Sequence, residues 1–401
     1  MSASGLSLAW VDRFRTVMAG HVTQGTVPGL VALVSRWDDL HVETMGQLAI
    51  SGQAMMQRDT IFRIASMTKP IAAVAAMMLI EECKLRLDDP VDPLLPELAD
   101  RRVLTSMDAR LDDTVPAKRA ITLRDLLTFR LGIGAVMAPP DRYPIAAAMA
   151  EAGLAPGPHV PTLTPDEWMR RLGRLPLIHQ PGDAWMYHTG SDILGVLIAR
   201  VTGRHLGDFL AERLFEPLGM KDTGFHVPID KRHRFATSYL TDPVSGKLSL
   251  YDDPRNSQWA EPPVFPAGGG GLVSTADDYL AFCRMLLGKG RYGGEQVLSR
   301  RSVEVMTMDQ LTPAQKAASH FVPGFWDNRG WGFGLSVMTH SSDLDAVPGR
   351  FGWDGGLGTS AYTDPAEGMI GILLTQAAWT SPKPPAVTRD FWTLTYQAVD
   401  E

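Results

Sequence analysis

Strand-like segments stand at both ends of the chain, and they limit the possible folds more than any other feature. Near the N-terminus, residues 30–34 form an unbroken apolar run and residues 41–46 alternate, which are the patterns of a buried and a half-buried strand. Residues 333–338, 359–362 and 369–374 near the C-terminus have strand-like patterns as well. The simplest arrangement is one antiparallel sheet built from both ends of the chain, with helices packed on it.

The rest of the chain is mostly helical in pattern. Apolar residues recur at helical spacing in nine segments: 8–21, 69–85, 123–129, 165–172, 192–201, 206–214, 276–287, 300–308 and 387–399. We therefore predict an α+β fold with two units, a sheet domain of residues 1–65 plus 326–401 and a mainly helical domain of residues 66–325. The proline-rich stretch 131–181 lacks clear periodicity and is predicted to be a surface excursion that forms a pocket wall.

Composition and charge argue against several classes of function. The 401-residue chain is 45% hydrophobic and 21% charged, which is ordinary for a globular protein. Its net charge of −7 gives no electrostatic support for a nucleic-acid or anionic-membrane partner. The longest apolar run, around residues 71–80, is too short to span a bilayer, so no transmembrane segment is expected.

The N-terminus and the cysteines favour a cytoplasmic protein. The first residues lack a basic region followed by a long apolar stretch, so no signal peptide is predicted. Cys83 and Cys283 are far apart in the sequence and do not suggest a disulfide framework. A periplasmic or secreted location stays open if the sequence is trimmed.

Ser66 and Lys69 form the first candidate catalytic motif, S-x-x-K. The motif lies where a helix should begin, since Pro70 suits a first turn and an apolar run follows. Residues three apart on a helix share one face, so Lys69 can approach the Ser66 hydroxyl. The helix N-terminus also offers backbone N–H groups to a developing oxyanion. The tetrapeptide alone is also compatible with an ordinary helix cap and a surface lysine.

The surrounding segments resemble those of the serine β-lactamase and penicillin-binding-protein superfamily, with class C β-lactamases and family VIII carboxylesterases nearest in appearance. The similar segments are 59–65 (DTIFRIA), 121–128 (ITLRDLLT), 216–220 (EPLGM) and 267–275 (AGGGGLVST). The resemblance extends from about residue 25 to 378. It implies a β-lactamase/transpeptidase-like fold, an acyl-enzyme on Ser66 and no cofactor.

By this resemblance, Tyr187-His188-Thr189 takes the place of a Tyr-x-Asn motif. Tyr187 would help Lys69 to remove the Ser66 proton, and a phenol with a pKa near 10 needs a nearby cation for this. Thr189 stands where Asn or Ser is usual, and we predict that it contacts substrate. His188 is expected to point away from Tyr187 and to be structural or solvated.

The third motif of the superfamily would be Trp353-Asp354-Gly355, within a glycine-rich segment predicted as a turn before a strand. These three residues are predicted to contact substrate, and the N–H groups of Ser66 and Gly356 to form the oxyanion hole. Lactamases have a cation at this motif, which binds the substrate carboxylate. Its absence favours a neutral substrate, although a neighbouring arginine such as Arg350 could replace the cation.

The sequence therefore predicts a serine hydrolase that cleaves short-chain, neutral carboxylic esters. Competing catalytic motifs are missing: the sequence contains no G-x-S-x-G, no H-E-x-x-H zinc motif and no phosphate-binding P-loop. We therefore expect a small-molecule ester as partner, with no metal and no nucleic acid. The alternatives are an acyltransferase with the same acyl-enzyme, a β-lactamase, a D-amino-acid peptidase and a non-catalytic binding domain.

Overall fold

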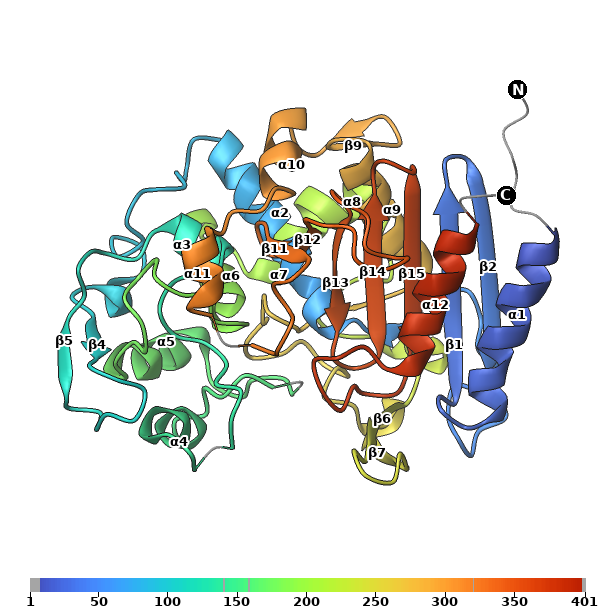
Figure 1. Ribbon diagram of the computed structural model, residues 1–401, viewed down its shortest axis with the longest axis horizontal. Coiled ribbons are helices and arrows are strands. Elements are labelled where there is room, and N and C mark those ends of the chain that lie inside the picture. Colours follow the sequence, from blue (N-terminus) through green and yellow to red (C-terminus); the bar gives the residue numbers. More distant parts are fainter. Residues whose placement is uncertain (1–7, 140, 158, 320, 399–401) are drawn as a thin grey trace.

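The computed structural model describes residues 8–139, 141–157, 159–319 and 321–398, and its centre is a seven-stranded antiparallel sheet (Figure 1). In sheet order, the strands are β11 (Arg329–Trp331), β12 (Ser336–Met338), β13 (Phe351–Gly355), β14 (Thr359–Asp364), β15 (Met369–Thr375), β1 (Gly29–Arg36) and β2 (Asp39–Gly46). The N-terminal hairpin joins the C-terminal strands where β1 pairs with β15, with Leu30 opposite Thr375. The predicted α+β fold, with a sheet built from both ends of the chain, is confirmed.

Strand β1 is buried on both faces, which explains its unbroken apolar run. Leu30, Ala32 and Val34 pack with the two terminal helices, whereas Val31 and Leu33 point into the main core on the other face. Each fully buried aliphatic side chain of this kind contributes roughly 1.5–3 kcal/mol. The two ends of the chain are therefore held together by hydrophobic contacts on both sides of the sheet.

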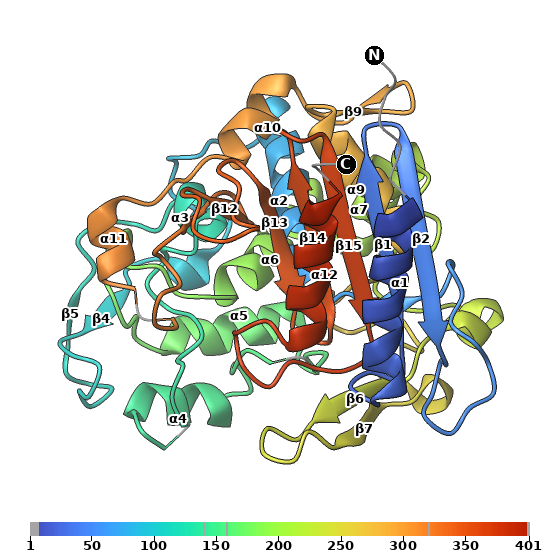
Figure 2. The same cartoon turned by 45° about the vertical axis from the view of Figure 1, so that its right-hand side comes forward.

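Two terminal helices, α1 (Leu8–Thr23) and α12 (Ala386–Gln397), lie side by side across one face of the sheet (Figure 2). Trp10 and Phe14 of α1 pack against Phe391 of α12, and the Trp10 indole donates to the Leu394 carbonyl at 2.7 Å. The opposite face is covered mainly by α9 (Ala276–Leu287).

The mainly helical part lies beside the sheet. Its helices are α2 (Thr68–Glu81), α3 (Leu123–Leu127), α4 (Pro144–Glu151), α5 (Pro165–Arg174), α6 (Thr189–Thr202), α7 (Leu206–Leu210), α8 (Glu216–Leu218), α10 (Arg300–Met306) and α11 (Pro313–Ala317). Four short strand pairs complete the fold: β3 (Phe62–Arg63) with β8 (Val273–Ser274), β4 (Arg102–Leu104) with β5 (Thr114–Pro116), β6 (Ser238–Thr241) with β7 (Leu248–Asp252), and β9 (Arg291–Tyr292) with β10 (Glu295–Gln296). Helix α4 within the proline-rich stretch was not predicted.

Strand β13 corrects the prediction of a turn at this segment. Its side chains alternate between buried and partly exposed, but two glycines hide that alternation in the sequence. Gly355 is needed because a Cβ atom there would lie 2.4 Å from the carbonyl oxygen of Ile64. The glycine therefore lets β13 press against the turn that precedes Ser66.

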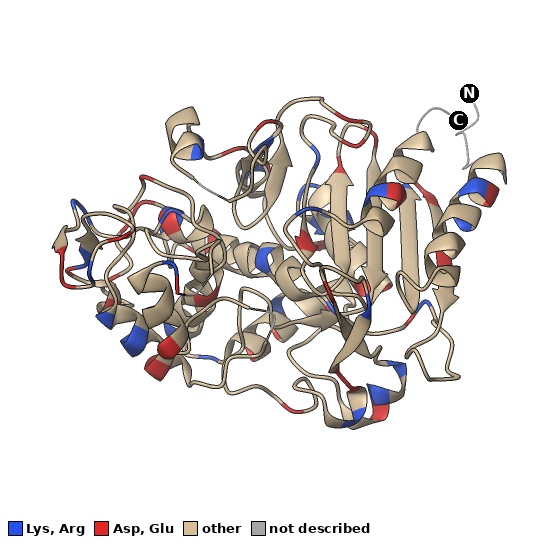
Figure 3. Cartoon of the chain, turned by 60° about the horizontal axis from the view of Figure 1, so that its bottom comes forward, with Lys and Arg blue, Asp and Glu red and all other residues tan. Residues whose placement is uncertain are grey.

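The surface has mixed charge. Lys and Arg are interspersed with Asp and Glu over the elements seen in Figure 3. Within the described part of the chain, no helix is long and apolar enough to cross a membrane.

Candidate active site

Ser66 lies in a short 3-10 turn, η1 (Ala65–Met67), which leads directly into α2. Ala65 has a φ of +43°, a left-handed conformation that is uncommon outside glycine and often marks functional sites. Ser66 is partly exposed, whereas Ala65 and Met67 are buried. Lys69 Nζ lies 2.9 Å from Ser66 Oγ, so the structure brings the two residues of the S-x-x-K motif together.

Lys69 is a buried amine rather than a surface lysine, with an exposed fraction of 0%. Its Nζ also donates to the Gly269 carbonyl, contacts His188 Nδ1 at 3.1 Å and lies 4.6 Å from the centre of the Tyr187 ring. Burial lowers the pKa of Lys69 to about 7, although the charge of Asp192 acts in the opposite direction. A large fraction of the amine is therefore neutral near pH 7 and can accept a proton.

Tyr187 sits between Ser66 and a cluster of aromatic rings. Its ring contacts those of Phe129, Trp185, Phe321, Trp331 and Trp353. The Trp353 indole N–H donates to its hydroxyl at 2.7 Å. Desolvation raises the pKa of Tyr187, although hydrogen bonds with Ser66 and Trp353 favour the phenolate. Tyr187 is therefore a neutral phenol at neutral pH.

Trp353 and Asp354 of β13, and the nearby Gly356, line the same cavity as Ser66. The Asp354 carboxylate accepts from Ser360 Oγ at 2.6 Å and Tyr362 Oη at 2.9 Å, so both of its oxygens are bound within the sheet. Gly355 is not among the residues that line the cavity. Its place is structural, as the point where β13 meets the turn before Ser66.

The structure places the two residues after Tyr187 differently. Thr189 is 1% exposed in the first turn of α6 and is not among the residues that line the cavity in front of Ser66. His188 points toward the site instead of away from it, since its ring packs against Tyr187 and reaches Lys69. The cause is the backbone of His188, whose φ of 83° turns its side chain inward.

The cavity in front of Ser66 has a volume of about 440 Å³ and is largely apolar. Its apolar lining includes Met137, Phe321, Phe325, Trp353 and Trp379. A second cavity, of about 450 Å³, shares Ala135, Met137, Tyr187 and Phe321 with the first. Residues of the proline-rich stretch 131–181 therefore line both cavities, and so does Tyr187.

Among the described residues, the arginine that lines the main cavity is not the one named from the sequence. Arg350 is 1% exposed, pairs with Asp345 at 2.9 Å and stacks 3.9 Å from the ring centre of Trp392. Arg329 lines the cavity instead, 5.5 Å from the ring centre of Phe325. Sequence reasoning missed Arg329, because the three-residue strand β11 is too short to show a period.

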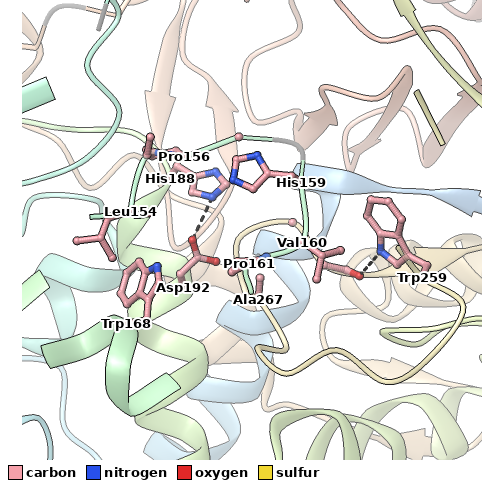
Figure 4. Close-up of a pocket in the computed structure, with 15 residues that line it drawn as sticks. Leu154, Pro156, His159, Val160, Pro161, Trp168, His188, Asp192, Trp259 and Ala267 are labelled. Carbon is pink, nitrogen blue, oxygen red and sulfur yellow. Dashed lines mark hydrogen bonds and ion pairs between the residues drawn. The ribbon is translucent and has the colours of Figure 1, made fainter. Parts of the chain in front are cut away.

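His188 and Asp192 also line a smaller, water-sized cavity of about 30 Å³ (Figure 4), which shares Pro156, Gly157, His188 and Gly270 with the main cavity. His159 and Trp168 also line it. Over the part of the chain that the structure describes, His, Cys, Asp and Glu side chains do not gather in a group suited to a metal ion.

Comparisons with known proteins bear on the family and the fold of the chain. A model of the Beta-lactamase family matches residues 14–390. Protein Rv1367c of Mycobacterium tuberculosis is 41% identical over 358 residues, covering 88% of this chain and 86% of the relative. Esterase EstB of Burkholderia gladioli is 29% identical over 369 residues, again covering 88% and 86%. The solved structure titled "EstCE1, a hydrolase with promiscuous acyltransferase activity" has the same fold, with a TM-score of 0.80 at 24% identity over 98% of this chain and 100% of that one.

Proposed function

Because the chain belongs to the Beta-lactamase family, we propose that it is a serine hydrolase that cleaves carboxylic esters through an acyl-enzyme on Ser66. The observation that supports this most strongly is the 2.9 Å contact between Ser66 Oγ and a buried Lys69 amine, at the floor of a largely apolar cavity. A serine hydroxyl is a weak nucleophile until an adjacent base accepts its proton. The similarity to esterase EstB supports placement in the carboxylesterase branch, family VIII.

In the first half of the reaction, neutral Lys69 accepts the proton of Ser66 as Ser66 Oγ bonds to the ester carbonyl carbon. The oxyanion that forms is stabilised by the N–H groups of Ser66 and Gly356. The bond to the alkoxide then breaks, and Tyr187 donates its hydroxyl proton to the leaving oxygen while Lys69 returns a proton to Tyr187. The pKa directions favour this division of roles over the initial hypothesis that Tyr187 acts as a base, because the phenol is too weakly acidic.

In the second half, water replaces the alcohol. Lys69 accepts a proton from the water as its oxygen bonds to the acyl carbon, and the bond to Ser66 Oγ breaks. Ser66 regains a proton and the carboxylic acid leaves, so the enzyme returns to its starting state.

The cavity lining supports neutral substrates. Most of the lining surface is apolar, although Arg329 and Asp354 also line the cavity, and neither Lys69 nor Tyr187 is expected to be charged above about pH 7. An uncharged ester loses little by entering such a cavity, whereas a carboxylate loses its hydration. We propose short, neutral acyl groups as the preferred substrates.

Acyl transfer to an alcohol is a second candidate, favoured by the second cavity beside Tyr187. An alcohol seated there could replace water in the second half of the reaction. The two candidates are separated by supplying p-nitrophenyl butyrate with increasing ethanol or butanol and measuring the ratio of ester to acid product. A ratio that exceeds the molar ratio of alcohol to water would favour transfer.

The experiment that tests the proposed function is hydrolysis of p-nitrophenyl butyrate by the wild-type protein and by Ser66→Ala. We expect turnover in the first and none above background in the second. Equal activity in the two proteins would exclude Ser66 as the nucleophile.

A further inference from the structure

Behind Lys69, two polar side chains continue the hydrogen-bonded chain away from Ser66. Lys69 Nζ lies 3.1 Å from His188 Nδ1, and His188 Nε2 lies 3.1 Å from Asp192 Oδ2. The other oxygen of Asp192 accepts from the Gly269 N–H at 2.8 Å. Figure 4 shows the His188 ring and Asp192 facing each other across this contact. None of these contacts is required by the reaction steps assigned to Ser66, Lys69 and Tyr187.

The local backbone is arranged around these side chains. His188 has φ 83° and ψ −65°, and the Thr189 N–H donates to the Tyr187 carbonyl at 3.2 Å, which together form a rare three-residue γ-turn. This turn lets two successive side chains, Tyr187 and His188, both approach Lys69. A Cβ atom on Gly269 would lie 2.6 Å from Asp192 Oδ1 and 3.0 Å from His188 Nε2, so glycine is required at this approach.

The protons of the chain can be assigned from the donors and acceptors. Asp192 already accepts from Gly269, and its pKa is lowered because His188 and Lys69 outweigh the effect of burial. An ionised Asp192 requires the proton of His188 on Nε2. Burial and the nearby Lys69 lower the pKa of His188, so the ring is neutral and Nδ1 is a bare acceptor.

This assignment orients the Lys69 amine. A neutral amine has two hydrogens and one lone pair. Two acceptors, His188 Nδ1 and the Gly269 carbonyl, take the two hydrogens, and the remaining direction points to Ser66 Oγ. The lone pair of Lys69 is therefore aimed at the proton that it must accept.

We propose that His188 and Asp192 are positioning residues: Asp192 fixes the tautomer of His188, and His188 aims the lone pair of Lys69 at Ser66. The proposal rests on the proposed function, because it explains how the base of that reaction is oriented. The groups that face Lys69 are His188 and Asp192 from the entry and first turn of α6, Tyr187 from the preceding loop, and Ser66 from η1. His188 is faced in addition by His159, across the small cavity.

Asp192→Asn is the most informative variant. The Gly269 N–H forces the oxygen of the introduced amide toward Gly269, so the amide NH₂ donates to His188 Nε2. His188 must then hold its proton on Nδ1 and donate it to the Lys69 lone pair. We expect kcat for p-nitrophenyl butyrate to fall about 100-fold or more, as the wrong tautomer disables a base.

His188→Asn is the matched partner. Asn tolerates a positive φ better than other non-glycine residues, and its side-chain oxygen can accept from Lys69 near the position of Nδ1. We expect kcat to stay within about tenfold of wild type. The Asn side chain has no alternative tautomer, so adding Asp192→Asn to this variant should lower kcat little further.

The remote pair His21 and Asp390, 2.9 Å apart, supplies the control: Asp390→Asn should not change kcat.

The pH dependence separates positioning from structural damage. The negative charge of Asp192 raises the pKa of Lys69, so Asp192→Asn should lower that pKa. The acid limb of the pH profile, where kcat/KM rises as Lys69 loses its proton, should therefore move to lower pH. The maximum value of kcat/KM should fall at the same time. The same shift should occur in the rate at which a fluorophosphonate labels Ser66. The proposal would be overturned if the acid limb of kcat/KM did not shift. It would also be overturned if Asp192→Asn lowered kcat by the same factor in the wild-type protein and in the His188→Asn variant.

Two further comparisons keep the test decisive. If Asp192→Asn does not fold, His188→Gln replaces it: its amide reaches toward Asp192 without an acceptor for Lys69, so kcat should lie at least about tenfold below that of His188→Asn. Equal values would contradict the positioning role. Turnover by Ser66→Ala would instead contradict the proposed function itself, whatever the result for His188.

Discussion

Ser66 lies between two unlike walls. The polar wall consists of Lys69, His188, Asp192 and Gly269, joined by short hydrogen bonds. The aromatic wall consists of Tyr187 and the rings around it, above all Trp353 and Phe321. Burial acts on both walls with opposite results for the pKa: it lowers that of the Lys69 amine and raises that of the Tyr187 phenol. Both groups become neutral, which suits a base and an acid that share one proton.

The comparison teaches that the two walls have separate tasks. The polar wall takes up and orients a proton through a continuous series of donors and acceptors. The aromatic wall excludes water and shapes the space for substrate. Changes in the polar wall should therefore alter kcat and its pH dependence, whereas changes in the aromatic wall and the cavities should alter which substrates are preferred.

The largest expected effect is that of Ser66→Ala, which removes the nucleophile between the walls. Turnover of p-nitrophenyl esters should fall to background, while the free energy of unfolding changes by less than about 1 kcal/mol because only one partly exposed hydroxyl is lost. Steady-state assays and urea unfolding measure the two quantities. Wild-type activity in purified Ser66→Ala would contradict the assignment of Ser66 as the nucleophile, on which the roles of both walls depend.

Lys69→Met and Tyr187→Phe compare the two walls directly. Each should lower kcat by about 10²–10⁴-fold, and the double variant should lose less than the product of the two, because they act on one proton. They should differ in pH dependence. The pKa of Lys69 is about 7, so at lower pH the amine is protonated and inactive. Wild-type kcat/KM should therefore rise with pH through about 7, and this rise is the acid limb of its pH profile. Tyr187→Phe should retain this limb and Lys69→Met should lose it; the opposite pattern would reverse the roles of acid and base.

Substrate class is expected to show a smaller effect. Losing a charge-assisted pair to a carboxylate costs roughly 1.5–3 kcal/mol, so kcat/KM for p-nitrophenyl acetate and butyrate should exceed that for nitrocefin by at least about 10- to 150-fold. Arg329 is the cavity cation that could reduce this difference. Arg329→Ala should therefore increase the preference for neutral esters. Nitrocefin turnover equal to ester turnover would favour a lactamase.

The smallest expected effect concerns chain length. Met137 lines both cavities, and Met137→Trp should reduce the space in both of them. We expect kcat/KM for p-nitrophenyl octanoate to fall about tenfold relative to the acetate ester. Met308, which is similarly exposed but lines neither cavity, provides the control variant Met308→Trp. Equal changes in the two variants would mean that the cavities do not set chain length.

The sequence predicted features that depend on local pattern. The apolar run of β1, the S-x-x-K spacing and the helical periods each follow from neighbouring residues, and the fold and the superfamily were predicted correctly. Features that depend on contacts between distant segments were missed. Strand β13 is one example, since Gly355 interrupts the alternation of apolar and polar residues by which a strand is predicted. Glycine is needed there because the strand passes close to Ile64.

His188 is the clearest case of this limit. An extended backbone would have pointed it away from Tyr187, and only the γ-turn at its φ of 83° brings it to Lys69. One signal was present: Asp192 follows it by four residues, a spacing that places two side chains on one face of a helix. The approach of Lys69 and Gly269 from other parts of the chain was not visible in that spacing.

Site-specific labelling tests the central claim most directly, namely that Ser66 is the nucleophile that a neutral Lys69 activates. The protein is treated with a fluorophosphonate over a pH series, and the adduct is located by peptide mass spectrometry while residual activity toward p-nitrophenyl butyrate is measured. We predict one adduct per chain, on Ser66, with a labelling rate that rises through about pH 7 and a matching loss of activity. An adduct on another residue, or full activity after complete modification of Ser66, would contradict the claim.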